Sequence, residues 1–118
     1  MKYISTRNGS KEFNFTEVFI KGLADDGGLF IPKTTSVLSE QELLKLSKLN
    51  YKDLAKEIIF LFCNETISKD ELSNIVEKSY SKFNEENVVK ITDIGENKIL
   101  ELYHGPTLAF KDIAMQFI

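Results

Sequence analysis

The chain has 118 residues, a formal net charge of −3 from 15 basic and 18 acidic residues, and 42% hydrophobic side chains. This balance is typical of a soluble globular domain and argues against disorder, and the lack of a basic tract argues against nucleic-acid binding. The single cysteine, Cys63, excludes an intramolecular disulfide, and its apolar run IIFLFC is too short to span a bilayer. The first ten residues lack the apolar core of a signal peptide. We therefore expect a soluble, cytoplasmic protein with no nucleic-acid or membrane partner.

Four helices are predicted in the first 85 residues, starting near residues 15, 40, 51 and 69. Three of them follow an Asn or Ser that has a Glu three residues later, which is the capping-box spacing. These pairs are Asn14–Glu17, Ser39–Glu42 and Ser68–Glu71, and the remaining helix follows Asn50. The last two helices carry apolar residues at i, i+3, i+4 and i+7, the pattern of one buried face. They predict a helical subdomain that packs on itself or on a neighbour.

Adjacent aspartates, Asp25 and Asp26, separate the first helix, which we expect over about 15–23, from a short strand at GLFIP. They lack the alternating spacing of a calcium loop, and Asp-Gly is turn chemistry, so we expect a turn and no metal site. Cys63 has no histidine or basic residue close in sequence. We expect it to be a buried structural thiol and not a nucleophile.

The pattern changes after the polar break NEEN at 84–87. Two short apolar runs, VVKITDI and KILELY, flank the turn residues GEN at 95–97 and predict a β-hairpin. We therefore expect an α/β chain with two parts. Residues 1–86 form a mainly helical N-terminal domain with a few short strands, and residues 87–118 begin a domain that contains a sheet.

The segment HGPTLAFKD follows the hairpin, and its layout is strand, Gly-Pro turn and a helix that starts near Ala109. Lys111 would then lie in the first helical turn among apolar neighbours. A solvated surface lysine is the ordinary alternative. However, the helix dipole and apolar surroundings both favour the neutral amine, which Schiff-base chemistry requires. His104 is the only histidine, and either lining a pocket or hydrogen bonding within the turn would suit it.

The segment LYHGPTLAFKD closely resembles the lysine segment of the threonine synthase family, whose members use pyridoxal phosphate. Two earlier segments, YISTR at 3–7 and GLADDGGLFIP at 22–32, resemble the N-terminal domain of the same family in the same order. The resemblance covers essentially the whole chain. One departure is Asn8, which stands between Arg7 and Gly9 where the family usually has a glycine directly after the arginine.

The resemblance implies the start of a fold-type II, tryptophan-synthase-like enzyme that converts O-phospho-L-homoserine and water to L-threonine and phosphate. Lys111 would be both the catalytic residue and the residue that holds pyridoxal 5'-phosphate as a Schiff base, and Asp112 would stabilise the helix start. The glycine-rich loop for the cofactor phosphate lies downstream in the family. We therefore expect an incomplete catalytic domain that neither binds the cofactor nor turns over substrate alone. The pattern gives no oligomeric state.

Other functions stay open at this point. The chain could be part of another fold-type II lyase, such as a threonine dehydratase or an O-acetylserine sulfhydrylase, although DDGGLFIP argues against both. It could also be a phosphatase-type relative that kept the motif but not the substrate. A non-catalytic helical module that docks a partner through its apolar C-terminal stretch, IAMQFI, is the alternative outside the enzymes.

Overall fold

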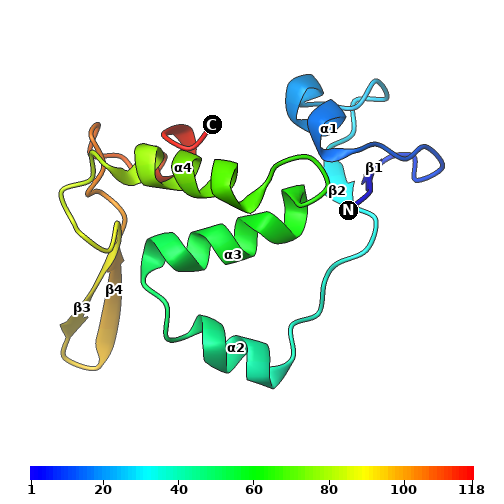
Figure 1. The fold of residues 1–118 in the computed structure, drawn as a ribbon. Coiled ribbons are helices and arrows are strands. Elements are labelled where there is room, and N and C mark those ends of the chain that lie inside the picture. The colour runs from blue at the N-terminus through cyan, green and yellow to red at the C-terminus, as the bar shows by residue number, and fades with distance from the viewer.

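The structure, a computed structural model, describes residues 1–118. Two antiparallel helices lie at its centre, α3 (Tyr51–Cys63) and α4 (Lys69–Tyr80). A small N-terminal unit flanks one end of the pair, a β-hairpin lies at the other end, and the C-terminus returns to α4 (Figure 1). No helix combines the length and the apolarity needed to cross a bilayer.

The helix starts are those that the capping residues predict. Asn14, Ser39, Asn50 and Ser68 each accept a hydrogen bond from the backbone N–H three residues on, and the three predicted capping boxes are all closed. Each cap satisfies an amide that a helix leaves without a partner. Helix α1 (Phe15–Lys21) and helix α2 (Glu40–Leu46) end two or three residues earlier than the predicted ranges.

The core lies between α3 and α4 and is small. Its buried residues are Cys63, Leu72, Val76, Tyr80 and Val88, and aromatic and aliphatic side chains from α1, α3 and several loops pack around them. Ionic contacts join the two helices at the surface, where Glu77 pairs with Lys52 at 3.0 Å and with Lys56 at 2.8 Å. Such exposed pairs contribute little, so apolar packing holds the helices together.

The N-terminal unit contains a strand that the sequence did not predict. Strand β1 (Tyr3–Ser5) pairs antiparallel with the predicted strand, β2 (Phe30–Pro32), and Tyr3 also exchanges backbone hydrogen bonds with Phe13. The Tyr3 hydroxyl donates to the carbonyl of Phe62 at 2.8 Å. This bond ties the unit to the end of α3.

The predicted hairpin is present as β3 (Lys90–Ile94) and β4 (Asn97–Glu101). It is a two-stranded ribbon exposed on both faces. Val88, just before it, is buried although its φ of 63° lies in the left-handed region that branched residues avoid. The boundary between residues 86 and 87 stays a prediction. Val88 and Phe117, on its far side, pack on the same core as α3 and α4.

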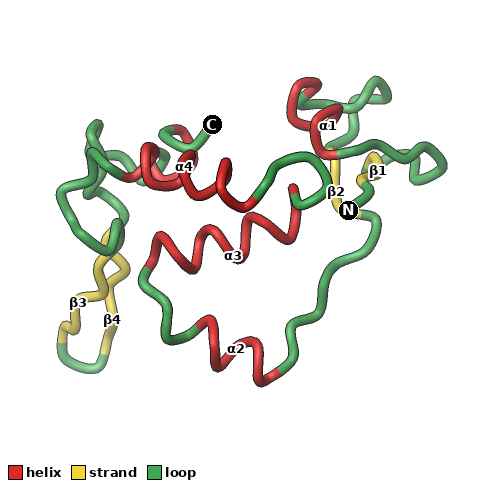
Figure 2. Tube along the Cα trace, in the orientation of Figure 1, coloured by secondary structure: helices red, strands yellow, loops and turns green.

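The last predicted helix is shorter than expected and starts later. Residues 109–111 form i to i+3 turns, and only α5 (Asp112–Met115) is helical. The prediction of a helix from Ala109 was therefore wrong. Leu108 has a φ of 61°, which a helix does not allow, and this residue turns the chain before the helix can begin. Figure 2 shows that loop fills most of the chain between β4 and α5.

Val76 offers a test of the core, because its side chain is completely buried. Val76→Ala leaves a cavity and should lower the free energy of unfolding by about 2 kcal/mol, measured by urea denaturation. Val37→Ala is the matched control, since Val37 is 91% exposed, and its effect should stay within about 0.5 kcal/mol. Equal effects of the two variants would contradict the core described above.

Candidate functional site

The segment from Glu101 to Met115 holds the candidate site. It leaves the end of β4, turns at Gly105, passes Lys111 and enters α5. Lys111 occupies the N-cap position of α5 and not its first turn, which corrects the prediction. Its side chain is exposed, and its amine makes no hydrogen bond or ion pair with the protein.

The apolar surroundings expected for Lys111 are also absent from this chain. The neighbouring apolar side chains Leu108, Phe110 and Met115 are 67%, 68% and 57% exposed, so they do not enclose the amine. The sequence argument took their apolar character as burial. In the structure they surround Lys111 along the chain but face solvent with it.

Asp112, the residue after Lys111, is the most tightly bound group of the segment. It is 3% exposed, and its carboxylate accepts hydrogen bonds from the backbone N–H of Thr107 at 2.8 Å and from the Thr107 hydroxyl at 2.9 Å. Gln116 donates a third at 3.3 Å. The carboxylate therefore fixes the turn that precedes Lys111, a larger role than the predicted one at the helix start.

These contacts decide the charge state of Asp112. Burial raises the pKa of the carboxyl, but the hydrogen bonds from Thr107 and Gln116 together outweigh burial and hold the pKa below its usual value. Because the pKa of Asp112 is lower in the folded chain than in the unfolded chain, the ionised carboxylate stabilises the fold. This contribution is complete above the pKa that Asp112 has in the unfolded chain. It is lost as the pH falls through the lower pKa of the folded state.

A second anchor comes from α4. The Tyr80 hydroxyl donates to the carbonyl of Ile113 at 3.0 Å, and the backbone N–H of Asn84, in the loop after α4, donates to the carbonyl of His104 at 2.9 Å. Phe117 packs against the core. The segment with Lys111 is therefore docked on the helical pair at several points along its length.

His104 binds within its own segment. Its Nε2 lies 2.8 Å from Glu101 Oε2, and the other carboxylate oxygen of Glu101 accepts from the Thr92 hydroxyl at 2.5 Å. These bonds, with that from Thr92 the largest cause, lower the pKa of Glu101. His104 thus links the turn to both strands of the hairpin, which supports the hydrogen-bonding role. Whether it also lines a cofactor pocket stays a prediction.

The other motif segments meet at a second hydrogen-bonded contact, between buried Ser5 and exposed Asp26. Asp26 accepts hydrogen bonds from the Ser5 hydroxyl at 2.8 Å and from the backbone N–H of Gly28 at 2.9 Å, and Arg7 donates to its carbonyl. The bond from Ser5 is the largest cause of the lowered pKa of Asp26. The predicted turn role is therefore confirmed. No group of three or more His, Cys, Asp or Glu side chains is placed to hold a metal ion.

The departure at Asn8 has a local explanation. The Asn8 side-chain oxygen accepts from both the backbone N–H and the hydroxyl of Ser10, at 3.0 and 2.7 Å. The extra residue therefore closes its own turn, as asparagine does in many loops. The contact between Ser5 and Asp26 is kept despite the insertion.

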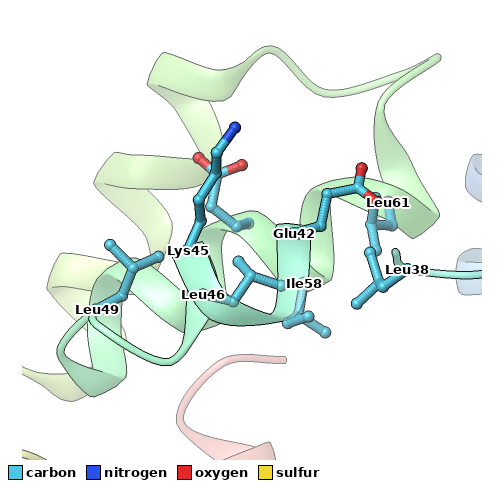
Figure 3. A pocket seen from close by; sticks show the side chains of 8 residues that line it. Leu38, Glu42, Lys45, Leu46, Leu49, Ile58 and Leu61 are labelled. Carbon is cyan, nitrogen blue, oxygen red and sulfur yellow. The ribbon is translucent and has the colours of Figure 1, made fainter. Parts of the chain in front are cut away.

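Two hollows lie away from Lys111. One, of about 320 Å³, lies between α2 and α3, with Glu42 and Lys45 beside apolar side chains such as Leu46 and Ile58 (Figure 3). The other, of about 490 Å³, is an apolar groove lined by α1, α3, α4 and the last two residues. Neither contains Lys111 or Asp112. The chain therefore presents a candidate anchor lysine without an enclosed pocket around it.

Together these features define a small α/β region of five helices and two two-stranded sheets, in which two motif turns are each closed by hydrogen bonds to an aspartate. The family described as "Threonine synthase N terminus" matches residues 2–80. The chain therefore belongs to the threonine synthase N-terminal family.

Full-length relatives agree over nearly the whole chain. Threonine synthase of Schizosaccharomyces pombe is 40% identical over 120 residues, which cover 100% of this chain and 23% of that protein. The crystal structure of threonine synthase from yeast matches with a TM-score of 0.93 at 41% identity, over 98% of this chain and 24% of that one. Threonine synthase from Brucella melitensis, solved with pyridoxal phosphate bound, matches with a TM-score of 0.94 at 33% identity, over 99% and 25%. The chain spans about a quarter of the length of these relatives.

The sequence reasoning did not identify Tyr80, Thr107 and Glu101 as contributors to the site. The apolar spacing of the helix after Ser68 predicts that one face is buried, which does not say where the Tyr80 hydroxyl points. Thr107 stands five residues before Asp112, and a threonine that follows a Gly-Pro turn could have suggested a side-chain bond across that turn. Nothing local to Tyr80 points to Ile113, 33 residues away.

Gly105 allows the Asp112 contact to be tested. A Cβ added at Gly105 would lie 2.4 Å from the Asp112 Cβ, so Gly105→Ala must displace the carboxylate. We expect a loss of about 1–3 kcal/mol of stability, as for other overpacked sites, and faster hydrogen exchange at the Thr107 amide. Gly9→Ala is the control, because its new Cβ would meet only an ordinary contact at 3.5 Å. A Gly105→Ala variant as stable as this control would refute the close packing.

Proposed function

We propose that this chain is the N-terminal part of a threonine synthase, which converts O-phospho-L-homoserine and water to L-threonine and phosphate. The observation that carries the proposal is the superposition on the pyridoxal-phosphate-bound Brucella protein over 99% of this chain, which includes the HGPTLAFKD segment. The family match over residues 2–80 supports it independently, because it does not include that segment.

Lys111 is the residue that we assign to the cofactor. Its primary amine is exposed and bound to no other group, so it is free for covalent attachment, which requires the neutral amine. When bound there, pyridoxal phosphate supplies an electron sink for the substrate's carbon skeleton. In this proposal the Lys111 amine, when it is not attached to the cofactor, would move protons at the α and β carbons of the substrate. His104 and Asp112 are given no proton-transfer step.

The activity belongs, in this proposal, to a protein longer than these 118 residues. The chain contains no glycine-rich loop that could hold the cofactor phosphate, and neither of the two hollows described above includes Lys111. The β3–β4 ribbon alone cannot close a cleft. The residues that bind both phosphates and cover the apolar side chains around Lys111 would come from the part of the enzyme that this chain does not include.

The 118-residue chain alone should release no phosphate from O-phospho-L-homoserine in the presence of pyridoxal phosphate. The physical reason is the missing enclosure around Lys111. Phosphate release by the purified chain, measured against a no-protein blank, checks this expectation. Turnover that depends on added cofactor would show that the chain is a complete enzyme.

Lys111→Ala in the full-length enzyme should remove the absorbance band of the lysine-bound cofactor and lower kcat by several orders of magnitude. The covalent attachment point and the proton-transferring amine are lost together. Lys90→Ala is the control, because Lys90 is an exposed lysine at the start of β3, and its spectrum and rate should match those of the unchanged enzyme. A normal band and rate in Lys111→Ala would assign the cofactor to another lysine.

A further inference from the structure

We propose that Tyr80 and Asp112 are positioning residues for Lys111: Tyr80 fixes the backbone after the lysine, and Asp112 fixes the turn before it. The inference rests on the assignment of Lys111 to the cofactor and adds two residues to that site. One of them, Tyr80, belongs to the helical N-terminal region and is far from Lys111 in sequence.

The Tyr80 hydroxyl cannot move without moving the core. Its residue is 5% exposed, and its ring is held edge-on by Tyr51, at 5.4 Å between centroids, and by Phe83, at 5.3 Å. Burial, the largest cause, raises the pKa of Tyr80 above its usual value, so the hydroxyl stays a hydrogen-bond donor. A rigid donor at this place fixes the position of whatever accepts from it.

The acceptor of the Tyr80 hydrogen bond lies close enough to Lys111 in the chain to fix the lysine's backbone. The carbonyl of Ile113, two residues after the lysine, receives the Tyr80 hydrogen bond, and no backbone amide donates to it. The neighbouring carbonyls of Asp112 and Ala114 accept from amides that follow in the chain, whereas that of Ile113 receives its hydrogen bond from another element. The start of α5 is thereby held against α4.

Asp112 fixes the chain on the other side of Lys111, at the turn that precedes the lysine. Its bonds to the amide and hydroxyl of Thr107 close the loop over residues 108–111, which contains Lys111 and the left-handed Leu108. The carboxylate is buried, whereas the Lys111 side chain is exposed. The backbone of Lys111 is therefore fixed at both ends while its amine remains free. A covalent anchor needs this combination, because orientation of the attached group determines the rate.

Tyr80→Phe removes one oxygen and keeps the ring, and it provides the first test. In the 118-residue chain we expect hydrogen exchange of the amides of residues 112–118 to become at least tenfold faster, with α3 unchanged. Tyr3→Phe is the matched control. It also removes a hydroxyl that donates to a backbone carbonyl, but that carbonyl belongs to Phe62. Unchanged exchange over residues 112–118 in Tyr80→Phe would overturn the role of Tyr80.

If Tyr80→Phe also accelerates hydrogen exchange in α3, the core itself has loosened, and this variant does not isolate the Tyr80 hydrogen bond. Asp112→Asn then provides the test of the proposal. Asp112 lies outside the α3–α4 core. The side-chain amide that this substitution introduces has one oxygen where the carboxylate has two, so it cannot accept both hydrogen bonds from Thr107 in the same way. Faster exchange confined to residues 105–118 supports the proposal, and exchange equal to that of the unchanged chain overturns it.

The consequence for catalysis is tested in the full-length enzyme. Tyr80→Phe and Asp112→Asn should each lower kcat about tenfold with KM changed less than twofold, whereas Tyr3→Phe should leave both constants unchanged. A role in stability alone would lower the amount of folded enzyme but not kcat per cofactor-loaded site. If kcat is unchanged while Lys111→Ala is inactive, the positioning inference fails and the function stands. If Lys111→Ala remains active, the assignment of the cofactor to Lys111 fails, and the positioning inference fails with it.

Discussion

The packing of α3 against α4 is the interaction on which the rest of this structure depends. Neither the N-terminal unit nor the C-terminal segment has a core of its own that could hold it in place. Each is attached to the helical pair by a tyrosine hydroxyl that binds a backbone carbonyl, Tyr3 to Phe62 and Tyr80 to Ile113. The two ends of the chain are thus positioned by one shared core, and loosening that core would release both.

Both sequence motifs have the same physical basis. In each, a carboxylate is held by the side chain of a serine or threonine and by a backbone amide, and a glycine leaves the space that it needs. A Cβ at Gly28 would lie 2.2 Å from the Ser5 hydroxyl, and one at Gly105 would lie 2.4 Å from Asp112. The motif residues are therefore largely those that build two turns. Lys111 projects from its turn with an exposed side chain that makes no hydrogen bond or ion pair.

Local signals made most of the fold predictable, and distant contacts explain what was missed. The four helix starts follow from caps whose partners lie three residues away. Strand β1 was missed because its partner, β2, is about 27 residues further on and a three-residue strand has no periodicity to detect. The prediction that buried apolar side chains surround Lys111 was wrong, because residues that are apolar and adjacent in sequence need not be buried. The chain turns at Leu108 with a φ of 61°, and the side chains of Leu108, Phe110 and Met115 are exposed.

The family match ends at residue 80, yet Tyr80 and the residues beyond it share one core with α3 and α4. The limit of the recognisable family region is therefore not a place where the molecule can be cut. A chimera that joins this region to the catalytic part of a relative at residue 80 would separate a tyrosine from its carbonyl and Val88 from its cavity. For exchange between homologues, the transferable unit is the whole stretch from Tyr3 to Phe117.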